Sequence, residues 1–107
     1  MREITDAAFM QDASAETQRI SYPLLERHRF HTLNESLDLD EWECLNLPST
    51  YVLSKDALAL PPGEFWWTPR FPDRLPGAPV IYPPGSHEAL FTQPKPLANA
   101  FIEAAGD

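Results

Sequence analysis

The stretch from residue 61 to residue 96 opens Pro61-Pro62-Gly63-Glu64-Phe65-Trp66-Trp67-Thr68-Pro69 and closes Pro94-Lys95-Pro96. It holds ten of the twelve prolines and three of the four glycines of the 107-residue chain. Because proline fixes φ and has no amide hydrogen, such a stretch sustains neither an ordinary helix nor a central strand. We therefore predict extended pieces and turns over residues 61–96.

Large apolar side chains distinguish this stretch from a disordered linker. Six of the twelve aromatic residues of the chain lie within it. A linker stays disordered because it has too few apolar groups to offset its ordering entropy. We predict instead an ordered arm that packs on the rest of the chain or on a partner. Trp66 and Trp67 are adjacent, so in an extended segment their side chains are expected to point to opposite sides.

The rest of the chain predicts a small α+β domain with a short antiparallel sheet. The apolar patterns and capping residues favour helices at 3–19, where Ser14 caps the second half, and at 23–28, 54–60 and 97–107. Alternating apolar residues favour strands at 29–33, 37–47 and 51–53. The predicted organisation is one domain, with an α+β core at 1–60, the arm at 61–96 and a docking helix at 97–107.

Length and composition place the chain among single-domain globular proteins. With 43% hydrophobic and 22% charged residues it can form a modest core. Neither a transmembrane run nor a cleavable signal sequence is recognisable, so we expect a cytoplasmic protein that does not bind membranes. The single cysteine, Cys44, excludes an internal disulfide and a multi-cysteine zinc site.

The net charge of -8 is concentrated in the middle of the chain. Residues 35–64 carry seven acids and one base, whereas the segments on either side are close to balance. This distribution argues against direct binding to nucleic acid, which requires Lys and Arg. It permits binding to a basic protein surface. The acids expected on a solvated strand face are Asp38, Asp40, Glu41 and Glu43.

The residue types that act in catalysis or metal binding in other proteins, here histidine and cysteine, form no recognisable motif in this sequence. His28 and His31 have no third ligand at a suitable spacing, and the neighbouring arginines disfavour a cation, so we predict no metal and no cofactor. Cys44 lies among acids that would disfavour a thiolate, so it is predicted to be a buried structural residue. A small-enzyme hypothesis rests on these three residues, His87 and scattered acids.

We therefore predict a non-enzymatic protein-binding or assembly protein, either a small structural subunit or an accessory factor. Its partner is expected to be a larger protein or a second copy of the chain. The alternative is an acidic inhibitor or nucleic-acid mimic that engages a basic surface through residues 35–64. Trp, Tyr and Arg are typical anchors of protein interfaces. The predicted interface residues are Phe65, Trp66, Trp67, Arg70, Phe71, Arg74, Tyr82 and Phe101.

Overall fold

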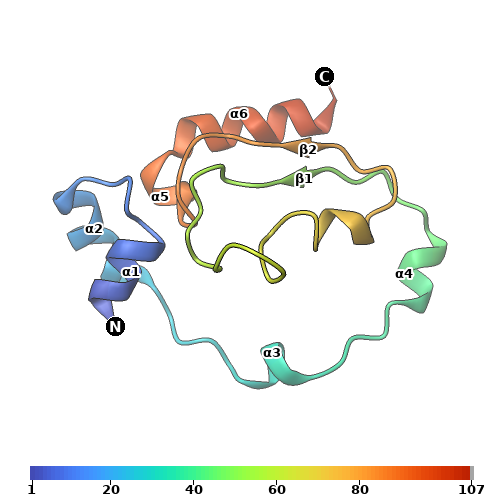
Figure 1. The fold of residues 1–107 in the computed structure, drawn as a ribbon, viewed down its shortest axis with the longest axis horizontal. Coiled ribbons are helices and arrows are strands. Elements are labelled where there is room, and N and C mark those ends of the chain that lie inside the picture. Colours follow the sequence, from blue (N-terminus) through green and yellow to red (C-terminus); the bar gives the residue numbers. More distant parts are fainter. Residues whose placement is uncertain (107) are drawn as a thin grey trace.

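The computed structural model describes residues 1–106, which form a mixed α and β structure of short elements (Figure 1). In chain order these are α1 (Arg2–Ala8), α2 (Ala15–Ser21), the 3-10 helix η1 (Tyr22–Leu24), α3 (His31–Asn34), α4 (Asp40–Cys44), β1 (Tyr51–Val52), the 3-10 helix η2 (Pro72–Arg74), β2 (Val80–Ile81), α5 (Ala89–Thr92) and α6 (Pro94–Ala105).

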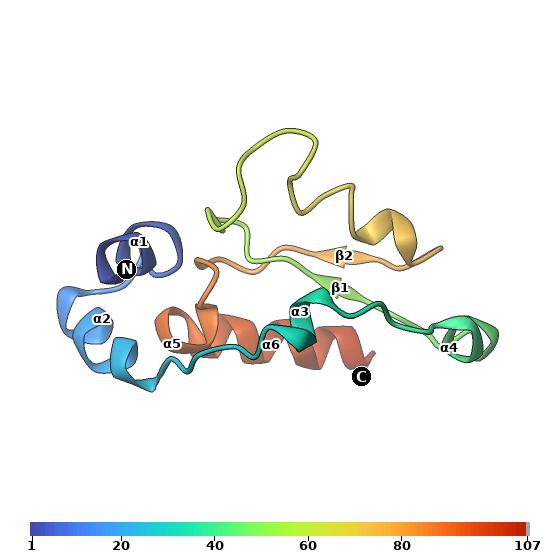
Figure 2. The same cartoon turned by 90° about the horizontal axis from the view of Figure 1, so that it is seen from below.

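The two strands are parallel, so the prediction of an antiparallel sheet is wrong. Tyr51 of β1 pairs with Val80 of β2, and Val52 pairs with Ile81. α6 runs alongside this pair in both views (Figures 1 and 2). The strand predicted at 51–53 is present, but its partner comes from within the proline-rich stretch.

Prolines explain why the pairing is so short. The amides of Tyr51 and Lys55 donate to the carbonyls of Pro79 and Pro83, each at 2.9 Å. A proline carbonyl can accept in this way, but proline has no N–H with which to return the bond. Pro79 directly before β2 and Pro83 two residues after it can therefore only accept, and the regular ladder covers two residues of each strand.

The prediction of strands at 29–33 and 37–47 is wrong as well. These segments contain the single-turn helices α3 and α4, and their side chains are exposed. The alternation of apolar residues in them therefore marks no buried sheet face. Without a neighbouring strand to take up their backbone groups, these residues satisfy them locally in helical turns.

The helical predictions are confirmed in part. Residues 3–19 contain two helices rather than one, and the Ser14 side chain caps α2 by accepting from the Thr17 amide at 3.1 Å. The C-terminal helix is present as α6, begins two residues earlier than Pro96, and ends at Gly106 with φ 73°. Residues 54–60 form turns instead of a helix, because amides there bond to the chain that follows β2.

The stretch from 61 to 96 is less irregular than predicted. It contains η2, β2, α5 and the first residues of α6, with loops between them. Short regular elements fit between the prolines because proline is tolerated in the first turn of a helix, as in η2 and α6.

The buried core is small and lies between the strands, α5, α6 and the N-terminal segment. Its fully or nearly fully buried apolar residues are Met10, Leu53, Ala57, Ala89 and Ala100. The radius of gyration is 15.6 Å, whereas a compact domain of this length has about 13 Å. α3 and α4 lie on an open arc of chain away from the core (Figure 1).

The accessible surface is correspondingly large. The chain exposes 8354 Å², whereas a folded monomer of this mass exposes about 6000 Å². Large apolar side chains such as Phe30, Leu33 and Leu37 are among those left exposed. Of the helices in residues 1–106, none combines the length and apolar character needed to cross a membrane.

Candidate functional site

The loops that follow β1 and β2 meet at the carboxyl ends of the two strands. The Asp56 amide donates to the Gly85 carbonyl at 3.0 Å, and the Gly85 amide donates to Asp56 Oδ2 at 3.1 Å. These reciprocal bonds hold an acid after β1 beside the Gly85-Ser86-His87 turn after β2. The carboxyl ends of parallel strands are where α/β proteins place their ligand sites.

The imidazole of His87 is held between two aromatic rings. The Trp67 ring stacks on it with a centroid distance of 5.3 Å and an angle of 20°, and the Phe9 ring meets it edge-on at 4.9 Å and 87°. The residue is nevertheless exposed. Its ring plane is therefore fixed by packing while part of the ring stays accessible to a reacting group.

A cavity of about 180 Å³ adjoins this histidine. It is lined by Tyr51, Val52, Leu53, Ser54, Ala57, Trp67 and His87. Burial raises the pKa of the Tyr51 phenol, so this group keeps its proton and its capacity to donate a hydrogen bond well into the alkaline range. The lining combines apolar side chains with the polar groups of Tyr51, Ser54 and His87, and such a combination occurs in small-molecule sites.

Gly85 lies in the turn before His87, and a substitution there is expected to disturb the turn. Its φ is 129°, a region that residues with a side chain rarely adopt. A Cβ at this position would approach atoms of Ala89 and Gln93 to between 3.1 and 3.2 Å. Only glycine allows the turn before His87 to lie this close to α5 and α6.

We expect Gly85→Ala to lower the free energy of unfolding by about 1–3 kcal/mol, through backbone strain and steric overlap. Urea denaturation followed by circular dichroism measures the change. The matched control is Gly77→Ala, because Gly77 has φ 74° and no atom within 4 Å of an added Cβ. Equal losses in the two variants would show that crowding at Gly85 is unimportant.

The structure separates the other residues of the small-enzyme hypothesis from His87. His28 and His31 flank and begin α3, where they contact Thr32 at 2.7 Å and Glu35 at 3.2 Å. Cys44 is exposed at the end of α4, so the prediction that it is buried is wrong. α4 lies on the outer arc, and none of its residues is buried. Within residues 1–106, no three His, Cys, Asp or Glu side chains gather as a metal site.

The predicted interface residues divide between internal contacts and the surface. Trp67 packs on Phe71 as well as on His87, with ring centroids 5.9 Å apart in the former pair. The Arg70 guanidinium lies over Phe71 at 4.9 Å and over Phe65 at 5.6 Å. Phe65, Tyr82 and Phe101 are more than half exposed, Trp66 is half-buried, and Arg74 lies over Phe71 at 6.0 Å. Their role in partner binding stays a prediction.

The predicted acidic surface lies on and beside a helix, so its placement on a strand face is wrong. Asp40, Glu41 and Glu43 belong to α4, and Asp38 Oδ1 accepts from the Asp40 amide at 3.2 Å just before it. All four acids are exposed. Whether they engage a basic partner stays a prediction.

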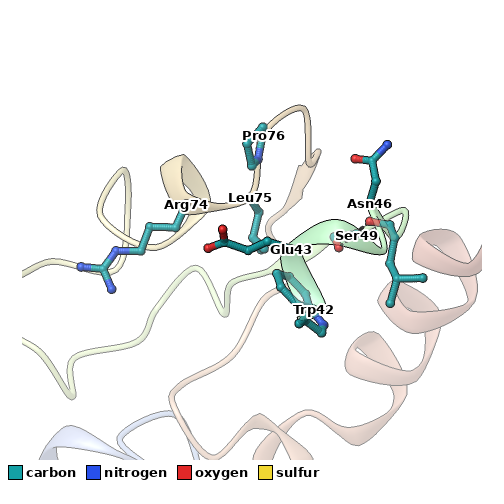
Figure 3. A pocket seen from close by; sticks show the side chains of 8 residues that line it. Trp42, Glu43, Asn46, Ser49, Arg74, Leu75 and Pro76 are labelled. Atoms are coloured by element: carbon teal, nitrogen blue, oxygen red, sulfur yellow. Dashed lines mark hydrogen bonds between the residues drawn. The ribbon is translucent and has the colours of Figure 1, made fainter. Parts of the chain in front are cut away.

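A second hollow of about 300 Å³ lies at the opposite end of the strands (Figure 3). Its lining residues come from α4 and the chain before β1, and from the end of η2 and the chain before β2: Trp42, Glu43, Asn46, Leu47, Ser49, Arg74, Leu75 and Pro76. It therefore faces the amino ends of β1 and β2, away from Asp56 and His87.

Comparison with known proteins gives one informative likeness. No family model matches the chain. No curated protein matches it either. A solved structure does match. It is described as an extracellular α/β-hydrolase from a Paenibacillus species that shares structural and functional homology with tobacco salicylic acid binding protein 2. The TM-score is 0.87 at 25% identity, over 100% of this chain and 45% of that chain. The chain thus spans less than half the length of the hydrolase it resembles.

Proposed function

We propose that this chain supplies the acid and the base of an α/β-hydrolase active site, with Asp56 as the acid and His87 as the base. The nucleophilic serine would come from a polypeptide segment outside residues 1–107. The observation that carries the proposal is the pair of hydrogen bonds between Asp56 and Gly85, which holds the acid beside the turn that ends in His87. The likeness to an α/β-hydrolase supports it.

The order of the residues agrees with this assignment. In α/β-hydrolases the triad follows the chain as Ser, then Asp or Glu, then His, with the serine in a G-x-S-x-G turn. Asp56 precedes His87, and residues 1–107 contain no G-x-S-x-G sequence. Ser86, next to the histidine, is fully buried and hydrogen-bonded, so it is unsuited to attack a substrate.

The proposed chemistry is hydrolysis of an ester. His87 takes the proton of the serine as the serine oxygen attacks the ester carbonyl, and then gives that proton to the departing alcohol. A water molecule then takes the place of the alcohol and attacks the acyl carbonyl while His87 accepts one of its protons. His87 returns that proton to the serine oxygen as the acyl–serine bond breaks, which releases the carboxylic acid. Asp56 holds the imidazole in the productive tautomer and stabilises its charged form.

The exposed surface supports completion of the site by another segment. The chain exposes about 2300 Å² more than a compact monomer of its mass. A surface of this size is in the range of obligate interfaces. The predicted protein-binding chain and the present proposal thus agree that a partner covers this surface. The two functions differ because, in the proposed hydrolase, the covering segment also completes a catalytic site.

The experiment is to purify the tagged protein that contains residues 1–107 from its native host cells, together with any bound polypeptide, and to treat the preparation with a biotinylated fluorophosphonate. This reagent labels serines that a neighbouring base activates. We expect a serine outside residues 1–107 to be labelled, and we expect the label to be lost when the tagged protein carries His87→Gln, because the activating base is then absent.

Two outcomes would contradict the proposal. Labelling that is unchanged by His87→Gln would show that the labelled serine is activated by another histidine. Capture of a partner that does not react with the fluorophosphonate would favour the non-enzymatic protein-binding function instead.

A further inference from the structure

The N-terminal segment from Phe9 to Asp12 reaches across the chain to the loop that carries His87. Asp12 Oδ2 accepts from the Ser86 amide at 3.1 Å and from Thr92 Oγ1 at 3.1 Å. Ser86 Oγ lies 3.4 Å from the same Thr92 hydroxyl. One carboxylate oxygen thus connects the residue before His87 to the end of α5, the short helix that follows it.

The neighbours of Asp12 reinforce this contact. The Phe9 carbonyl accepts from the Glu88 amide at 2.9 Å, and the Phe9 ring meets the His87 ring edge-on. The Gln11 side-chain amide donates to the Asp56 carbonyl. Three residues of this segment, Phe9, Gln11 and Asp12, therefore contact His87 itself, the residues on both sides of it, and the proposed acid.

The segment is anchored well enough to act as a fixed support. Met10 is completely buried, and its carbonyl accepts from the Gln18 side chain of α2 at 2.9 Å. Ser86 is also completely buried, so its amide needs a protein acceptor. Bonds to an ionised acceptor are stronger than bonds between neutral groups. A carboxylate at position 12 therefore gives that buried amide a strong partner.

We propose that Asp12 is a positioning residue for His87: it fixes the turn 85–88, and through that turn the orientation of the imidazole. The inference rests on the proposed function for its catalytic meaning, although the positioning itself is a property of this chain. Asp12 touches neither the cavity lining nor the reacting atoms, and it acts only through Ser86 and Thr92.

The test is nuclear magnetic resonance of the full 107-residue chain. In Asp12→Ala we expect hydrogen exchange of the Ser86 amide to accelerate on the order of tenfold or more, because its charged acceptor is gone. The ring-nitrogen signals of His87 should shift toward a mixture of tautomers. Exchange of the Leu53 amide, which bonds to Ile81 beyond the altered loop, should be unchanged. Asp12→Asn keeps an acceptor oxygen and should restore most of the wild-type behaviour.

Glu16→Ala is the matched control, because Glu16 is an exposed acid whose side chain bonds to Arg19 of the same helix. It should leave both readouts unchanged. Uniformly faster exchange in Asp12→Ala, or an unchanged His87 spectrum in a folded variant, would overturn the inference. If Asp12→Ala does not fold, Thr92→Val removes one of the two bonds and should give the same local changes, smaller in size; their absence would likewise overturn it.

The proposed function can fail separately. If Asp56→Asn leaves the His87 ring signals unchanged while Asp12→Ala alters them, the acid–base pairing is wrong and the positioning role of Asp12 stands.

Discussion

Replacing His87 with glutamine is expected to lower kcat/KM for a p-nitrophenyl ester by about 10⁴-fold or more, in the purified protein that joins residues 1–107 with the serine-bearing segment. Glutamine has a side chain of similar reach but cannot accept and return a proton. The loss should therefore appear in kcat, whereas KM should change little. The packing of Trp67 and Phe9 around position 87 limits the structural damage that this exchange can cause.

His31→Gln is the matched control for this prediction. His31 is an exposed histidine at the start of α3, where it contacts Glu35 and lies far along the chain from the cavity residues. Its replacement should leave kcat/KM at the wild-type value. A similar loss in both variants, or full activity in His87→Gln, would remove His87 from the catalytic site.

Asp56→Asn is expected to lower kcat by about 10⁴-fold, the effect that follows when the acid of a Ser-His-Asp triad no longer fixes the histidine tautomer. Asparagine retains a side-chain oxygen that can accept from the Gly85 amide, so the loop contact should persist. Steady-state kinetics measures the loss, and thermal unfolding of the same variant reports whether the loop contact is retained.

The control for Asp56 is Asp38→Asn, which neutralises an exposed acid in the most acidic part of the chain. The two variants change the net charge equally. If both lower kcat by the same factor, general electrostatics explains the effect and the triad assignment of Asp56 is contradicted. An Asp56→Asn variant with wild-type kcat would contradict it directly.

Part of this fold was predictable from local sequence because some signals are strictly local. Ser14 caps α2 as predicted, because a cap depends on the residues of one turn. The strand at Tyr51–Val52 was also predictable from its aromatic and β-branched residues. Its partner β2 was not, because prolines on both sides of Val80–Ile81 predict a break.

The site was harder to predict than the helices. In the sequence, His87 is one of three histidines, and Asp56 lies within the predicted helix 54–60, which does not form. Recognising the pair required the parallel pairing of two strands 29 positions apart, which no local pattern encodes. Two signals were nevertheless present: an acid shortly after one strand, and Gly85-Ser86-His87 shortly after Val80–Ile81.

The prolines near β2, by keeping the ladder short, also affect how mutations act on this chain. A ladder of two residue pairs fixes the register of β1 against β2 only weakly. The position of Asp56 relative to His87 therefore depends on the contacts outside the ladder. Several of those contacts come from the first twelve residues. Substitutions at the N-terminus, remote in sequence from any reacting group, would therefore tune the reactivity of this site while leaving the strands as they are.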